Sequence, residues 1–500
     1  MDETNPLLPD ATAERVREIE DARDDIVDFD PSGDAENPLE WAQAYKWAIV
    51  GLLAFMAFTV YEGKPTTNGY QYLPDQTKLT DFSIRTFTCI SGDPRKSSSV
   101  LLVTIWELGE AAGPLLMAPL SEMFGRYPVI NAANVGFIGA TVLAALSQKA
   151  PLFIAARFLT GLAVATNVLN PAIVGDMFAT EQRGSAMSLV QLAPITGGAV
   201  GPLISGAMAE TIGWRSVVWL SVGLACVCEA FLLTGFKETY KVPILRRKVA
   251  RLRDETGDKA LRTAFDLMDN EQGPRKLWDA MMRPVIVFAD SFVLQLMSLF
   301  GAMTFSYFYI FSTTYPDILI QTYHLTPAQT GLAFIPLTAG SIIGTLVCNS
   351  VLDRIYIKLR AANDGIGLPE YRLPIVIVGA FALPTTFIMY GWAAEMHVPL
   401  WLMLTASGVF GFAMNFAFMP VFTFVVDAFG LYSASAITAM IVTRCIAATF
   451  LPLAAVSLIK LLGAGFGCTV LGAVGLAFAP IPVLVYRFGP AWRQHSKYTK

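Results

Sequence analysis

Two glutamates stand three residues apart in the otherwise apolar stretch TIWELGEAAGP. Residues three apart on a helix are neighbours on one face, so Glu107 and Glu110 lie side by side if this stretch is helical. Two carboxylates so close repel each other when both are ionised, and one of them can then bind and release a proton. We predict that the pair carries protons. The alternative is that both face an outer vestibule and only attract cations.

Three more ionisable residues lie inside apolar stretches, where a charge is costly and is usually retained for function. Arg157 could hold a nearby carboxylate ionised until a proton or a substrate intervenes. Asp290 is the next candidate proton carrier, or else an interfacial residue, because Arg283 and Pro284 mark the start of its helix. Arg444 is the third of these residues.

Uncharged polar and aromatic side chains in the same stretches could contact a substrate. The stretch FGAMTFSYFYIF is dense in aromatic rings, which suit a bulky apolar or cationic ligand through stacking and cation–π contact. The alternative is that these rings face lipid or form an interfacial belt. The candidate substrate-binding residues are Asn167, Gln191, Gln295, Tyr307 and Asn415.

The composition shows what must position these residues. Of 500 residues, 54% are hydrophobic and 15% charged, whereas a soluble chain has about 25% charged residues. About 20 apolar residues cross a membrane, and the chain contains twelve such segments, at 47–60, 100–120, 128–147, 152–175, 185–209, 216–236, 285–311, 331–350, 374–394, 399–425, 433–458 and 465–486. The longest polar stretch between them divides the twelve into six and six.

The distribution of Lys and Arg predicts the orientation, because these residues concentrate in cytoplasmic loops. The central stretch carries twelve of them, so both termini and this loop are expected in the cytoplasm. Its segment ILRRKVARLRDET is basic and amphipathic and is expected to lie along the inner leaflet. The predicted regions are a largely disordered acidic tail at 1–46, a six-helix bundle at 47–236, the central loop at 237–283, a second bundle at 284–486 and a cytoplasmic tail at 487–500.

The two halves carry similar motifs at corresponding places. APLSEMFGR follows the second segment and NSVLDRIYIKLR follows the eighth. Each puts an acid and then an arginine at a cytoplasmic turn: Glu122 and Arg126 with Gly125 between them, then Asp353 and Arg354. Matched halves indicate an internal duplication around a central cavity, as in many secondary transporters. A chance pair of charges at the membrane surface is the alternative for the second copy.

Several stretches resemble the major facilitator superfamily, and within it the fungal branch of twelve-span drug:proton antiporters. The similar stretches are DAENPLEWAQAYKW, GPLLMAPLSEMFGRYPV, RFLTGLAVATNVLNPAIVGDMF, ETYKVPILRRKVARLRDETG and VDAFGLYSASA. The resemblance covers nearly the whole chain from about residue 28.

The resemblance assigns roles to two motifs. Glu122, Gly125 and Arg126 match the cytoplasmic gating motif, although Ala118 replaces its usual glycine and Tyr127 a common second basic residue. In TGGAVGPLISG, the residues Gly197, Gly201 and Pro202 match the antiporter signature of the fifth span. Glycines one turn apart admit a close helix neighbour, and proline bends the helix there. The signature implies a tightly sealed cavity and antiport; an ordinary packing seam is the alternative.

Residues 61–85 have no counterpart in that pattern and form part of an anomalous outer loop, 61–99. They leave the first span with about 14 apolar residues, fewer than the 17 or so that a span needs. We hypothesise that part of this segment is a retained intron or a gene-model error. Transcript reads that cross the region without a splice would contradict the hypothesis.

The sequence therefore predicts an all-α membrane protein with twelve transmembrane helices in two pseudo-symmetric six-helix bundles. The predicted function is export of a small organic compound by proton antiport with alternating access. Proton-coupled or facilitated uptake of a nutrient, and a non-transporting sensor, are the alternatives. The three histidines are isolated and no phosphate-binding loop is present, so no enzyme, cofactor or metal is expected.

The expected partners are a small-molecule substrate, protons and the lipid bilayer. Nucleic acid is excluded because the net charge is −4. We predict a monomer in the plasma membrane, with a vacuolar or endosomal membrane as the alternative.

Overall fold

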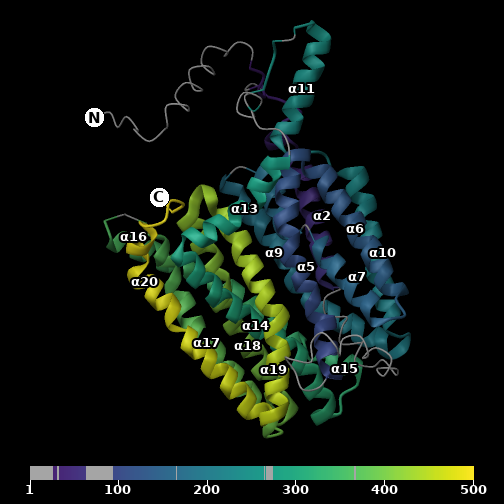
Figure 1. Ribbon diagram of the computed structural model, residues 1–500, viewed down its shortest axis with the longest axis vertical. Coiled ribbons are helices and arrows are strands. Elements are labelled where there is room, and N and C mark those ends of the chain that lie inside the picture. Colours follow the sequence, from purple (N-terminus) through teal and green to yellow (C-terminus); the bar gives the residue numbers. More distant parts are fainter. Residues whose placement is uncertain are drawn as a thin grey trace.

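The computed structural model describes residues 26–30, 33–62, 94–164, 166–178, 180–258, 260–263, 265, 274–364 and 367–499. Nearly all of the anomalous segment 61–85 lies outside them, so the structure does not address the splicing hypothesis. The described chain is almost entirely helical, and its two halves stand side by side (Figure 1). The fold class is thus the predicted one.

Helices of the first half run along the chain in the order of the first six predicted spans. They are α2 (Gln43–Glu62), α5 (Pro94–Phe124), α6 (Arg126–Leu146), α7 (Ala150–Leu162), α8 (Thr166–Met177), α9 (Thr180–Thr211) and α10 (Trp214–Gly235). The short 3-10 helix η2 (Pro38–Glu40) precedes them, and α11 (Lys241–Thr256) follows in the central loop. Buried residues of α2, α6, α8, α9 and α10 make one hydrophobic core.

Helices of the second half form a larger core, centred on aromatic residues of α14, α17 and α18. They are α13 (Pro274–Asp290), α14 (Phe292–Tyr323), α15 (Pro327–Leu332), α16 (Ile335–Ala362), η4 (Pro369–Arg372), α17 (Leu373–Glu395), α18 (Leu400–Phe429), η5 (Gly430–Tyr432), α19 (Ser433–Phe478) and α20 (Pro480–Arg493). The last two spans meet at Gly463, whose φ of 81° turns the chain inside α19.

Each predicted span coincides with a helix or with two consecutive helices. Within the described residues, eight helical stretches meet length and hydropathy criteria for crossing a membrane, one of them the 61-residue run Ser433–Arg493. The first span is among them, so the prediction that it is too short is wrong. Its helix begins at Gln43, ahead of the apolar run, and supplies the 18-residue stretch Gln43–Val60.

The glycine- and proline-rich stretch of the fifth span is helical. Helix α9 runs for 32 residues and contains both Pro194 and Pro202. Proline deprives a helix of one backbone hydrogen bond, but inside a membrane protein the neighbouring helices can satisfy the freed groups. The absence of a side chain at Gly206 allows α9 to approach the backbone of Pro327 and Ala328 closely.

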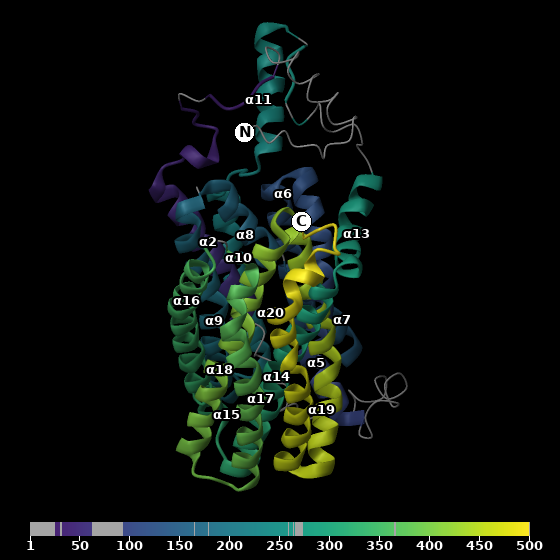
Figure 2. The same ribbon diagram turned by 90° about the vertical axis from the view of Figure 1, so that its left-hand side faces the viewer.

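Helix α11 projects from the end of the bundle, near the C-terminus (Figures 1 and 2). Its basic face is occupied by the acidic segment that precedes α2. Lys248 Nζ lies 2.6 Å from Asp34 Oδ2, and Arg251 Nη1 lies 2.7 Å from Glu36 Oε1. Two basic residues of α11 are therefore paired within the protein, and the position of this segment along the inner leaflet stays a prediction.

Candidate functional site

Helices α5 and α7 touch backbone to backbone at the turn that carries the two glutamates. A Cβ on Gly161 would lie 3.0 Å from the backbone nitrogen of Glu110, and one on Gly109 would lie 2.7 Å from that of Leu162. Glycine at both positions allows this approach. The rigid contact fixes the turn from which Glu107 and Glu110 project, and both side chains are completely buried.

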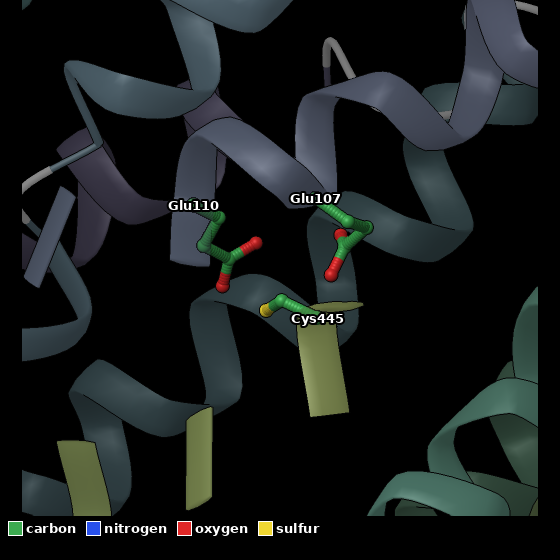
Figure 3. A group of neighbouring side chains, drawn as sticks. All are labelled: Glu107, Glu110 and Cys445. Atoms are coloured by element: carbon green, nitrogen blue, oxygen red, sulfur yellow. The ribbon is translucent and has the colours of Figure 1, made fainter. Parts of the chain in front are cut away.

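Glu110 forms an ion pair with the second half. Its Oε1 lies 3.3 Å from Arg444 Nη2 of α19, and the arginine side chain is 10% exposed. Figure 3 shows both glutamates pointing from α5 toward Cys445, the neighbour of Arg444 on α19. Potential donor atoms of Glu107, Glu110 and Cys445 all lie within 4.8 Å of one another. The adjacent guanidinium opposes a bound cation, so we do not assign a metal to this group.

Glu107 is bonded to the second half as well. The hydroxyl of Tyr309, on α14, donates a hydrogen bond to Glu107 Oε1. Phe305 lies one turn earlier on α14, and the Arg444 guanidinium lies 4.4 Å from its ring centroid. Each glutamate thus has a partner on the opposite half, and the partners are surrounded by aromatic rings.

Contacts between α5 and α19 continue toward the end of the bundle remote from the C-terminus. The Thr449 hydroxyl donates to the Thr104 carbonyl oxygen at 3.2 Å. Farther along, Leu453 packs against Ile105. The two halves therefore touch from the glutamates toward the remote end.

A second contact between the halves joins α9 to α15 at the same end. A Cβ on Gly206 would lie 3.1 Å from the carbonyl carbon of Pro327, and one on Gly331 would lie 3.0 Å from that of Pro202. Glu210 Oε2 accepts a hydrogen bond from the backbone nitrogen of Ala328 at 3.1 Å. The structure thus places the predicted signature, with Gly201 and Pro202 both buried, in the helix that closes onto the second half.

The other two predicted proton-linked residues lie in different settings. Arg157 is buried at 8% exposure on α7, one turn before Gly161. Asp290 is exposed at the end of α13, where its Oδ2 accepts hydrogen bonds from the Ser496 hydroxyl at 2.7 Å and the Lys497 backbone nitrogen at 3.0 Å. This geometry favours the interfacial alternative for Asp290, which anchors the C-terminal tail.

Most predicted substrate-binding residues have intramolecular partners. The Tyr307 hydroxyl donates to the Leu471 carbonyl oxygen at 2.7 Å inside the second half. Gln295 donates to two carbonyl oxygens at the junction of α13 and α14, and Asn415 Oδ1 accepts from the Thr345 hydroxyl. The side chains of Asn167 and Gln191 lie outside the described residues. The face of α14 toward the glutamates carries Phe305 and Tyr309 rather than Tyr307.

The turn between α5 and α6 holds the first copy of the charged motif. Gly125 adopts a φ of 99°, and a side chain there would collide with the Glu238 carboxylate. Arg126 Nε pairs with Asp176 Oδ2 of α8 at 3.2 Å, while Glu122 is exposed. Glu238 Oε1 accepts a bond from the Arg126 backbone nitrogen at 2.8 Å, as expected for an anion at a helix N-terminus.

The loop after α10 completes this cluster. The Tyr240 ring lies 4.7 Å from the Arg126 guanidinium, and burial raises the pKa of this tyrosine. The Thr239 hydroxyl donates to Asp176 Oδ2 at 3.3 Å. The motif therefore joins three helix ends of the first half.

The second copy is built around a residue that the sequence did not single out. Arg372, at the end of η4, pairs with Asp353 at 2.9 Å and with Asp427 of α18 at 3.1 Å. Arg354, the predicted partner, is exposed. Arg372–Asp427 thus matches Arg126–Asp176: an arginine at the start of the third span of each half meets an acid near the end of the fourth span.

Sequence reasoning missed Tyr309, Asp176 and Glu238, and gave no role to Arg444. Helical spacing could have found one of them, because Phe305 and Tyr309 lie four apart on the face opposite Tyr307. Asp176 and Glu238 each pair with residues far away in the chain, so no local spacing in the sequence predicts these contacts.

Comparison with known proteins accounts for this arrangement. Residues 93–452 match the sequence pattern of a family described as the Major Facilitator Superfamily. The chain belongs to the Major Facilitator Superfamily. Among relatives in this superfamily is the efflux pump radE of Floropilus chiversii, 32% identical over 98% of this chain and 88% of that protein. Another is the MFS transporter cpaT of Aspergillus oryzae, 32% identical over 94% of this chain and 92% of that protein.

Solved structures agree on the Major Facilitator Superfamily fold. A partially occluded, inward-open form of the xylose transporter XylE from E. coli matches with a TM-score of 0.64 at 16% identity, over 89% of this chain and 98% of that one. At this identity the likeness concerns the fold alone. As a member of the Major Facilitator Superfamily, the chain is a multi-pass membrane transporter of small molecules.

Proposed function

We propose that this protein exports a small organic compound in exchange for protons, by alternating access of a site between its two halves. One observation carries the proposal: two buried carboxylates of the first half, Glu107 and Glu110, bond to side chains of the second half. A buried carboxylate between moving halves can change its partner as they move. That is the requirement for linking a proton to the motion.

The carboxylates explain antiport through competition. A proton and a hydrogen-bonding substrate that use the same oxygens exclude each other, so binding of one releases the other. We assign substrate contact to the aromatic rings beside the carboxylates, Phe305, Tyr309 and Phe418. The ring centroids of Phe305 and Phe418 lie 5.4 Å apart in a stacked pair. The name of the efflux pump among the relatives supports the outward direction.

We place the end that bears α11 and the C-terminus in the cytoplasm and the protein in the plasma membrane. The excess of Lys and Arg in the central loop supports this orientation. A proton entering the cell then supplies the energy, since one charge moving through 100 mV is worth about 2.3 kcal/mol.

An efflux assay in yeast that lacks its own drug exporters tests the proposal. Cells expressing the protein are loaded with a cationic aromatic dye, rhodamine 6G, or a neutral one, Nile red, and retained fluorescence is measured. We expect faster loss of at least one dye, abolished by a protonophore. Glu107→Gln and Glu110→Gln should each reduce this efflux strongly, because an amide cannot take up the proton.

Glu255→Gln is the matched control, since Glu255 lies on α11 with a side chain 61% exposed. If both glutamine variants exported the dye as the wild type does, the assignment of protons to these residues would be wrong. Protein-dependent accumulation of the dye would instead favour uptake.

A further inference from the structure

We propose that the basic face of α11 is a docking surface for anionic phospholipid headgroups and that the acidic segment before α2 covers it as an internal competitor. The acidic segment comprises residues 26–30 and 33–36 of the described chain. The inference goes beyond export, because it rests on the placement of α11 at the cytoplasmic end of the bundle and not on the coupling of transport to protons.

Helix α11 carries a high density of positive charge directly after the sixth span. Its 16 residues include the basic residues Lys241, Arg246, Arg247, Lys248, Arg251 and Arg253. Clusters of about four to eight Lys and Arg on an amphipathic helix at the cytoplasmic surface are attracted to anionic lipids. The same helix buries Ile244, Leu245 and Val249, and apolar residues beside basic ones are what a helix needs to lie in a membrane interface.

The acidic segment meets α11 with three carboxylates spaced along the helix. The ion pairs are Asp28 with Lys241 at 3.0 Å, Asp34 with Lys248 at 2.6 Å and Glu36 with Arg251 at 2.7 Å. The three basic partners are seven and three residues apart in the chain, which places them on one stripe of the helix. A single short stretch of chain therefore neutralises one basic stripe.

An aromatic ring lies between the carboxylates of this segment. The centroid of the Phe29 ring lies 5.6 Å from Lys241 Nζ and 5.8 Å from Lys248 Nζ. The segment thus presents anionic groups together with an apolar one to the face of α11. Anionic headgroups above the hydrocarbon of a bilayer present the same combination, so the surface that accepts the segment also fits the membrane.

The three ion pairs differ in how readily they exchange for another anion. In the first and the third pair all four side chains are partly or largely open to water, and such pairs contribute little to stability. The Asp34–Lys248 pair is better sheltered, with side chains 11% and 15% exposed, and it holds the segment in place. An anionic membrane surface attracts every basic residue of α11 at once, including the exposed Arg247.

The loop before α11 keeps the helix within reach of the bilayer. Helix α10 ends at Gly235 and α11 begins at Lys241, so only residues 236–240 separate the sixth span from the basic helix. While the acidic segment is bound, α11 projects away from the bundle (Figures 1 and 2). Once freed from the segment, it lies down beside the sixth span with its basic face on the headgroups.

Energy transfer from α11 to lipid measures this approach. The full-length protein is placed in nanodiscs with a donor dye on Ala250→Cys, an exposed position of α11, and with an acceptor dye on the lipid headgroups. Cys226, which is exposed, and Cys89 are replaced by alanine so that the dye attaches at one place. The nanodiscs contain phosphatidylcholine alone or a mixture with phosphatidylserine, at physiological salt.

Removal of the three carboxylates should release the helix. The wild type should give low energy transfer with both lipids. The triple variant Asp28→Asn, Asp34→Asn and Glu36→Gln should give severalfold more transfer in the discs with phosphatidylserine and no more in phosphatidylcholine alone. Adding Lys248→Gln and Arg251→Gln to the triple variant should remove the increase, because the anionic lipid then loses part of the basic stripe.

A single substitution and its matched control complete the set. Asp34→Asn alone breaks the best-sheltered pair and should give part of the increase, and it decides the question if the triple variant does not fold. Asp279→Asn removes the same charge at an exposed acid of α13, outside the acidic segment. It should leave energy transfer at the wild-type level.

Equal transfer from the triple variant in the two lipids would overturn the anionic docking surface. A wild type that approaches the phosphatidylserine discs as closely as the triple variant does would overturn the competition. Dye efflux in cells is a separate readout. Failure of the docking surface leaves the proposed export untouched, while a wild type without gradient-dependent efflux loses the proposed function and leaves the energy-transfer result standing.

Discussion

Replacing Gly206 by alanine should weaken the contact between the two halves at the remote end. The added Cβ would lie 3.1 Å from the carbonyl carbon of Pro327 and 3.4 Å from the Cα of Ala328, and closer still to the Pro327 carbonyl oxygen. These are backbone atoms of α15, which cannot swing aside as the tip of a side chain can. The two helices must therefore move apart.

The magnitude follows from two opposing terms. Overpacking of this kind costs about 1–3 kcal/mol, while alanine in place of glycine stabilises a helix by about 1 kcal/mol in water. Gly198→Ala on the same helix should show only the gain in helix stability, because a Cβ at Gly198 has no neighbour within 4 Å among the described residues. We expect Gly206→Ala to be less stable than Gly198→Ala by about 1–3 kcal/mol, the clash term by itself.

Thermal unfolding of the purified variants in detergent, followed by intrinsic tryptophan fluorescence, measures this difference. Dye efflux measures the effect on transport. Destabilising the conformation in which α9 and α15 touch lowers its population about tenfold for each 1.4 kcal/mol. Gly206→Ala should melt at a lower temperature than Gly198→Ala and transport more slowly. Equal melting temperatures and equal transport for the two variants would refute the packing argument.

Two further predictions concern the charged end of the bundle. Asp176→Asn and Asp427→Asn should each impair dye efflux several-fold, because each removes an ion pair that joins two helix ends, Arg126–Asp176 or Arg372–Asp427. Arg354→Gln should change little, and equal effects of all three would contradict the assignment. The hydrogen bond from Lys248 holds the pKa of Asp34 below its ordinary value of 3.8, so the contact of the acidic segment with α11 is stable above that pH and is lost as the pH falls through the lowered pKa. Limited proteolysis of the acidic segment before α2 should accordingly become faster with Asp34→Lys and return toward the wild-type rate with Asp34→Lys plus Lys248→Asp. A rate that stays unchanged in both variants would mean that the ion pair does not hold the segment.

The sequence by itself determined the spans and the class of protein. An apolar run long enough to cross a membrane is a local property, because its backbone groups must form their hydrogen bonds within one helix. The small residues of α9 predicted a close helix contact, because residues with small side chains let two helix backbones approach each other. Glu107 and Glu110 stood out because ionised groups are costly among apolar neighbours.

Tertiary structure alone decided which partners these residues meet. Arg444 lies 334 residues after Glu110, and Arg372 rather than Arg354 reaches Asp427, because the packing of whole helices sets which side chains face one another. The same packing placed Tyr307 in the core and Tyr309 at the carboxylates, although both belong to one aromatic stretch. A membrane-spanning helix is apolar on all sides, so its sequence shows that it crosses the bilayer but not which of its faces meets the other half.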